Sequence, residues 1–132
     1  MIPKINKGIL LYGYTENDAQ FLQEAISETI SDQILLKSAS NQKERTIKEI
    51  LDQHTGFSYQ QNQPKIILFF GMDDTDIQCI LSDFPGSINR PIFCGLTEHN
   101  INWKFEELID HLLAEQEMMK KQLSKQQSQN TT

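Results

Sequence analysis

The chain has 132 residues, with 18 acidic against 12 basic side chains and a formal net charge of −6. This length fits one compact domain, and a composition of 38% hydrophobic and 23% charged residues excludes a disordered or fibrous chain. The acidic balance disfavours nucleic acid as a partner, and the longest apolar runs fall short of the roughly 20 residues of a membrane span, so we expect neither kind of partner.

The two cysteines, Cys79 and Cys94, lie inside apolar stretches and lack a Cys-x-x-Cys spacing. We expect both to be reduced core residues of a cytoplasmic protein, since a free cysteine behaves as a small hydrophobe. The opening MIPKINKGILLYGY does not fit a signal peptide, because its apolar run is short and no small-residue cleavage site follows. We expect no cofactor and no metal site.

An internal repeat organises the chain. A shift of 58 positions aligns residues 8–54 with residues 66–112 without a gap. The identical pairs include Leu10 with Leu68 and Asp18 with Asp76. The alternative is a chance likeness between two βα units, against which the gapless register argues.

Each copy is expected to form a strand, a helix, a second strand and a second helix. The first strands, at 8–14 and 65–72, are short apolar runs typical of strands buried on both faces. The helices after them begin at TEND and DDTD, which are capping sequences, and carry an apolar stripe. The second strands are expected at 33–37 and 91–96, and the second helices at 46–54 and 103–119.

The remaining segments set the domain limits. Residues 55–63 are mostly polar and predict a linker between the two copies. Residues 120–132 are rich in Gln, Ser and Lys, which predicts a frayed or disordered polar tail. We therefore expect a single α/β domain over residues 1–119.

Alternating strands and helices predict one four-stranded, mostly parallel sheet with helices on both faces. We predict the strand order 2-1-3-4, with a pseudo-twofold axis parallel to the strands. Because ligands bind at the carboxyl ends of parallel strands, the turns at Gly13 and Gly71 should then meet near one switch point.

The polar residues at these strand ends have ordinary structural explanations. Asp73, Asp74 and Asp76 could hold a divalent cation, but helix capping and dipole complementarity explain them sufficiently. Cys94 could be a nucleophile with His99 as its base, although a buried structural thiol is the preferred interpretation.

The segment IFCGLTEHNINWKFEELIDHLLAEQE is the most distinctive part of the chain. An apolar strand is followed by Thr97, Asn100 and Trp103 in a Thr-x-x-Asn-x-x-Trp spacing, and then by an acidic amphipathic helix. With the preceding KIILFFGMDDTDIQCIL, it resembles a small bacterial family catalogued only as a domain of unknown function, over about residues 64–117. The resemblance implies a compact α/β domain of bacterial origin and supplies no catalytic residues.

Thr97, His99, Asn100 and Trp103 are the candidate ligand-binding or partner-binding residues. The alternative is structural: Thr97 or Asn100 shapes the loop or caps a helix, and Trp103 covers the edge of the core. A shared site would be excluded if local backbone hydrogen bonds fully occupied the Thr97 and Asn100 side chains.

The last helix offers a second candidate surface. Ile109, Leu112, Met119 and Leu123 recur at heptad-like spacing, interrupted by Gln116. This seam could extend beyond the domain and pair with a second copy or another protein. The alternative is a helix whose first half packs on the sheet while its second half is solvated.

The sequence favours a non-enzymatic regulatory or protein-interaction module. The alternative is a small-molecule-binding or catalytic domain with its site at the strand carboxyl ends of the second repeat. A cavity among polar groups at those strand ends would favour the ligand-binding or catalytic domain. An exposed apolar surface on the last helix would favour the interaction module.

Overall fold

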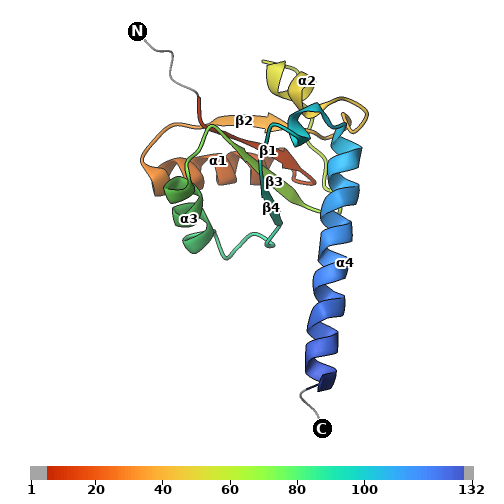
Figure 1. Cartoon of the computed structure of the whole chain (residues 1–132). Helices are drawn as coiled ribbons and strands as arrows, with labels where there is room; N and C mark the ends of the chain where they lie inside the picture. The colour runs from red at the N-terminus through yellow and green to blue at the C-terminus, as the bar shows by residue number, and fades with distance from the viewer. Residues whose placement is uncertain (1–5, 130–132) are drawn as a thin grey trace.

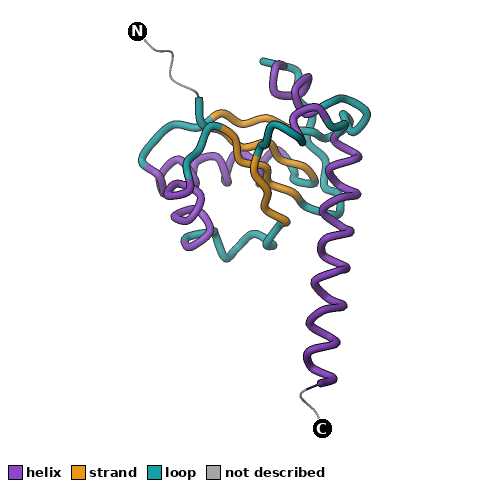
Figure 2. Tube along the Cα trace, viewed as in Figure 1, coloured by secondary structure: helices purple, strands orange, loops and turns teal. Residues whose placement is uncertain are grey.

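The computed structural model describes residues 6–129, with side chains described through residue 122. Its elements alternate between strand and helix along the chain (Figures 1 and 2). In order they are β1 (Gly8–Tyr12), α1 (Glu16–Ile30), β2 (Leu35–Ser38), α2 (Ile47–Asp52), β3 (Ile66–Phe70), α3 (Asp74–Ser82), β4 (Ile92–Gly95), the short 3-10 helix η1 (Asn100–Asn102) and α4 (Phe105–Gln129).

The four strands form one sheet in the order β2-β1-β3-β4, which confirms the predicted order. β1 pairs with β2 in parallel, and so does β3 with β4. The central pair, β1 with β3, is antiparallel. The sheet is therefore mixed, with two parallel pairs joined back to back at its centre.

The path of the linker explains the antiparallel centre. α2 has six residues, so its length of about 9 Å cannot carry the chain back along a strand of about 16 Å. The linker instead remains at the end of the sheet where β1 ends. The Asn62 backbone amide and the Lys65 ammonium hold it there by donating to the Gly13 carbonyl, at 3.2 and 2.6 Å. β3 thus enters the sheet where β1 leaves it and runs the opposite way.

The predicted axis parallel to the strands is therefore wrong. Residues 8–54 and 66–112 are related by an approximate twofold axis perpendicular to the sheet, because β1 and β3 pair antiparallel at its centre. The Ile47 amide donates to the Trp103 carbonyl and the Phe105 amide donates to the Arg45 carbonyl, both at 2.9 Å, and each atom has its counterpart in the other copy. This axis also places the turns at Gly13 and Gly71 at opposite ends of the sheet.

Each face of the sheet carries one core, because side chains along a strand alternate between the two faces. α1 and α3 cover one face, and α2 and α4 cover the other (Figure 1). The first core contains Leu11, Leu22, Ile26, Ile67 and Ile80 among others, and the second contains Leu10, Ile47, Leu68, Phe105 and Leu108 among others.

The predicted helix starts are observed. Thr15 and Asp73 accept hydrogen bonds from the Asp18 and Asp76 amides, and Thr46 forms a reciprocal capping box with Glu49. α4 starts near the expected position but continues to Gln129, ten residues beyond the expected end. Its last part contains good helix formers and neither Gly nor Pro, which supports this extension.

Candidate functional site

The loop from β4 to α4 contains the candidate residues of the second copy. The Thr97 backbone amide donates to Asn100 Oδ1 at 2.8 Å, and the Asn100 backbone amide donates to Thr97 Oγ1 at 3.0 Å. Asn100 Nδ2 also donates to the Gly95 carbonyl at 2.9 Å. These three bonds tie the loop to the end of β4, so Thr97 and Asn100 have a clear structural task.

The Trp103 and His99 side chains form no described hydrogen bond with this pair. The half-buried Trp103 ring stacks on the exposed His111 ring, with 4.3 Å between ring centroids and 15° between planes. His99 is exposed and makes no capping bond to η1. The four candidate residues lie close in the chain, but the described side-chain contacts link only Thr97 with Asn100, and the Trp103 backbone amide donates to the Asn100 carbonyl at 3.0 Å.

A shallow hollow of about 440 Å³ lies beside this loop. Its lining is largely apolar and comes from Leu96, Thr97, Glu98 and Ile101. Only Thr97 of the four candidate residues lines it. Glu98 and Ile101 occupy unspecified positions of the Thr-x-x-Asn-x-x-Trp motif, so the motif did not identify them as candidate binding residues.

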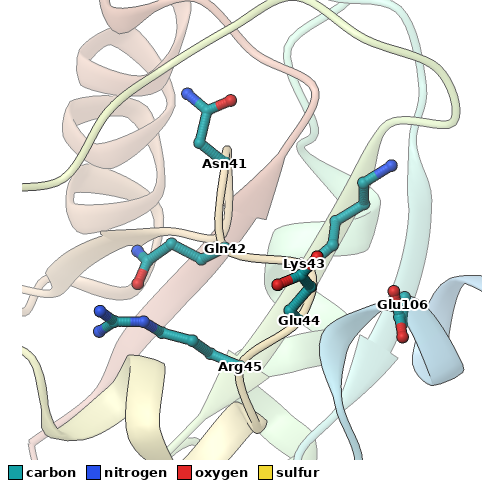
Figure 3. A pocket seen from close by; sticks show the side chains of 6 residues that line it. All are labelled: Asn41, Gln42, Lys43, Glu44, Arg45 and Glu106. Carbon is teal, nitrogen blue, oxygen red and sulfur yellow. The ribbon is translucent and has the colours of Figure 1, made fainter.

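The matching loop of the first copy forms a second hollow, of about 450 Å³, that the sequence analysis missed (Figure 3). Figure 3 shows Gln42 and Arg45 extending to the same side of the loop, and Asn41 has a left-handed backbone with φ of 62°. The lining is Asn41, Gln42, Lys43, Glu44, Arg45 and Glu106. The signal that could have found it is the repeat itself, since residues 41–45 align with 99–103.

The candidate nucleophile Cys94 and the possible metal ligands do not form a reactive site. Cys94 is partly buried and its Sγ lies 3.8 Å from the Ile67 carbonyl oxygen. Burial and the negative charge of Glu115 raise the pKa of Cys94 to about 12, so its thiol stays protonated and is a poor nucleophile. Within residues 6–129, no group of three or more His, Cys, Asp and Glu side chains is placed to hold a metal ion.

One candidate surface remains, the exposed half of α4, which we define as residues 113–122. The helix buries Phe105, Leu108, Ile109 and Leu112 against the sheet. Beyond Leu112 the described side chains are exposed, including Met118 at 62% and Met119 at 63%. Figure 1 shows this half projecting away from the sheet.

Comparison with known proteins finds a family match for part of the chain. Residues 65–119 match the family described as Domain of unknown function (DUF3783). The match runs from the start of β3 into the exposed half of α4 and agrees with the resemblance expected over about residues 64–117. Searches of curated proteins and of solved structures gave no significant match. None of the described helices combines the length and apolar character needed to cross a membrane.

Proposed function

We propose that this protein is a non-enzymatic regulatory or protein-interaction module, and that the exposed half of α4 is its binding element. The observation that carries the proposal is the direction of the apolar stripe on α4. Met119 follows the buried Leu112 by seven residues, or about two helical turns, so both lie on the same side of the helix. The stripe that packs on the sheet thus continues past the domain as an uncovered surface.

Two further features support this reading. Most of the stability of a helix in a protein comes from packing of its amphipathic face, so a projecting helical half gains stability from a partner. Methionine also adapts its shape to an opposing surface. An exposed apolar stripe on a helix is one of the recurrent modes of protein recognition.

Met118 and Met119 provide a matched test. They are the same residue type with nearly equal exposure, but they differ by about 100° around the helix, so only Met119 continues the buried stripe. We expect partners that bind wild type and Met118→Glu to be lost with Met119→Glu, as measured by pull-down and then by binding of the purified partner. Equal binding by all three proteins would contradict the proposal.

The second candidate function is small-molecule binding at the hollow lined by Leu96, Thr97, Glu98 and Ile101. The hollow itself, at the carboxyl end of β4, is the observation that favours it. Its test is a thermal-shift screen against nucleotides, metabolites and divalent metals. A ligand at about a hundred times its Kd adds about 2.7 kcal/mol, or several degrees. A hit lost in Ile101→Glu but kept in Lys43→Glu, a change in the other hollow, would favour this function.

We also propose that the protein works in a bacterial cytoplasm. The two free cysteines, Cys79 and Cys94, support a reducing compartment. The bacterial origin follows from the family resemblance alone.

A further inference from the structure

We infer that the protein binds a small oxyanion, a phosphate or a carboxylate, between Lys65 and Arg90 at the amino end of β4. This site goes beyond the proposed function, which concerns the apolar stripe on α4. It also lies at the opposite end of β4 from the hollow at residues 96–101. Three observations carry it: an ion pair in the first copy, the replacement of its acid in the second copy, and a hollow at that place.

In the first copy, carboxylates neutralise the lysine that precedes the first strand. The Lys7 ammonium lies 3.4 Å from an Asp32 carboxylate oxygen and 2.8 Å from one of Asp76. Asp32 belongs to the segment that leads into β2, and the Leu35 amide at the start of β2 donates to the Lys7 carbonyl at 2.8 Å. The lysine beside the first strand is thus paired with an acid beside the second strand.

The second copy repeats this backbone arrangement. The shift of 58 positions aligns Lys7 with Lys65, and the Ile92 amide at the start of β4 donates to the Lys65 carbonyl at 2.9 Å. The segment that leads into β4 therefore passes Lys65 as the segment that leads into β2 passes Lys7.

The acid, however, is replaced in this segment. The shift of 58 positions aligns Asp32 with Arg90. Counting back three residues from the amide that begins each second strand aligns Asp32 with Asn89 instead. By either alignment, a cation or an amide stands where the first copy has its carboxylate.

Lys65 is consequently a half-buried cation without a counter-ion. Its ammonium donates to the Gly13 carbonyl at 2.6 Å and lies 5.1 Å from the centroid of the Tyr14 ring. Asp18, the counterpart of Asp76, forms no ion pair with it, and neither does any other side chain described through residue 122. A charge partly removed from water costs free energy unless it is paired, so an anion at this place is favoured.

A hollow of about 180 Å³ lies at the place of the replaced acid. Its lining residues include two cations, Lys65 and Arg90, and three amide residues, Gln63, Asn89 and Gln116, but no Asp or Glu. The hollows at residues 41–45 and 96–101 each have at least one glutamate in their lining. In a chain with a net charge of −6, a lining of this kind selects for anions.

The chemistry and the size of the hollow fit an oxyanion. The Arg90 guanidinium lies 5.2 Å from the centroid of the Phe93 ring, and its fork of N–H donors matches a carboxylate or a phosphate. Side-chain amides supply further donors. Clefts that hold drug-sized ligands measure about 300–1,000 Å³, so this smaller hollow suits a single oxyanion group.

The experiment is a titration of the isotope-labelled full chain with inorganic phosphate, followed by NMR at an ionic strength held constant with potassium chloride. We expect saturable shifts of the Arg90 and Asn89 side-chain N–H signals. Arg90→Gln should raise the phosphate dissociation constant by about tenfold or more, because hydrogen bonds from a charged group are lost. Arg45→Gln, at the other arginine of the chain, should leave it unchanged. Both arginines are exposed, so both variants should keep the wild-type spectrum elsewhere.

Two further measurements sharpen the test. Asn89→Asp supplies a carboxylate like that of Asp32, so it should weaken phosphate binding without lowering the urea midpoint. A parallel titration with malonate shows whether the site prefers a carboxylate or a phosphate, since the preferred group saturates the shifts at lower concentration. Saturation by neither anion would overturn the inference. Equal weakening in Arg90→Gln and Arg45→Gln, or binding that leaves the Arg90 and Asn89 signals unmoved, would overturn it too.

Discussion

Leu10 lies directly opposite Leu68 in the antiparallel pairing of β1 with β3, and both side chains are fully buried. The two leucines occupy equivalent positions of the two copies, so the approximate twofold axis passes between them. Thr46 and Lys104, which are also equivalent, form an isolated antiparallel bridge near the same axis. The copies therefore share both cores, and we expect them to unfold as one cooperative unit.

Gly13→Ala should destabilise the domain at the linker. Gly13 has φ of +92°, and an added Cβ would lie 2.6 Å from the Asn62 carbonyl oxygen. We expect the free energy of unfolding to fall by about 1–3 kcal/mol, as measured by urea denaturation. Gly86→Ala is the control, because no heavy atom beyond its two chain neighbours lies within 4 Å of the added Cβ. Equal effects of the two changes would show that the linker does not depend on this turn.

Asn100→Ala should destabilise the loop from β4 to α4. Asn100 is only 7% exposed, and its loss leaves the Thr97 amide and the Gly95 carbonyl without their partner. The expected loss is about 1–3 kcal/mol of unfolding free energy. Asn102→Ala, an exposed change in the same short helix, should have little effect on the urea midpoint. If Asn100→Ala were as stable as wild type, the Asn100 side chain would have no structural role, and a binding role would be favoured.

Glu49 should make stability depend on acid pH. Hydrogen bonds from the Thr46 amide and hydroxyl lower the pKa of Glu49. Because the pKa is lower in the folded state, this contribution is present above the unfolded pKa and is lost as the pH falls through the folded pKa. The stability difference between wild type and Glu49→Gln should therefore shrink in acid, as measured by urea denaturation across the range. Glu44→Gln is the matched control, and a constant difference would contradict the expectation.

The prediction that both cysteines lie in the core is wrong for Cys79, which is exposed, so the two thiols should differ sharply in reactivity. With a pKa of about 12, Cys94 is almost entirely protonated near pH 8, whereas Cys79 is exposed. A thiol reagent should therefore modify Cys79 first and reach Cys94 only when denaturant opens the core. Mass spectrometry of the modified peptides measures this order. Rapid labelling of Cys94 in the folded protein would show that the core opens locally.

Ending the chain after Gln116 should leave the domain folded. Among the side chains of α4 described through residue 122, the last buried one is Leu112, so we expect the removed part to contribute little to either core. We expect the thermal midpoint, followed by circular dichroism, to change by no more than about a few degrees. A large drop would mean that the exposed half stabilises its own domain, and it would argue against a free binding element.

Much of the fold follows from local patterns. The apolar runs around Leu10 and Leu68 predict buried strands, and the repeat predicts their central place in the order β2-β1-β3-β4. The direction of β3 was not predictable, because it depends on hydrogen bonds from Asn62 and Lys65 to Gly13. Those contacts are distant in sequence and have no local pattern.

The candidate site was less predictable than the fold. The spacing of Thr97 and Asn100 located the loop, but spacing does not reveal that their polar atoms bond to each other. The hollow at residues 41–45 was missed because the first copy lacks the motif residues. On α4, the heptad-like pattern identified Met119, yet only the fold shows where the sheet stops covering that stripe.

The twofold relationship has a consequence for how such a chain can arise. Contacts that join Ile47 to Trp103 and Phe105 to Arg45 are isologous, since each surface meets its own counterpart. Two separate half-length chains could form the same interface as a homodimer. A connection as short as residues 55–63 is enough to join two such halves into one chain.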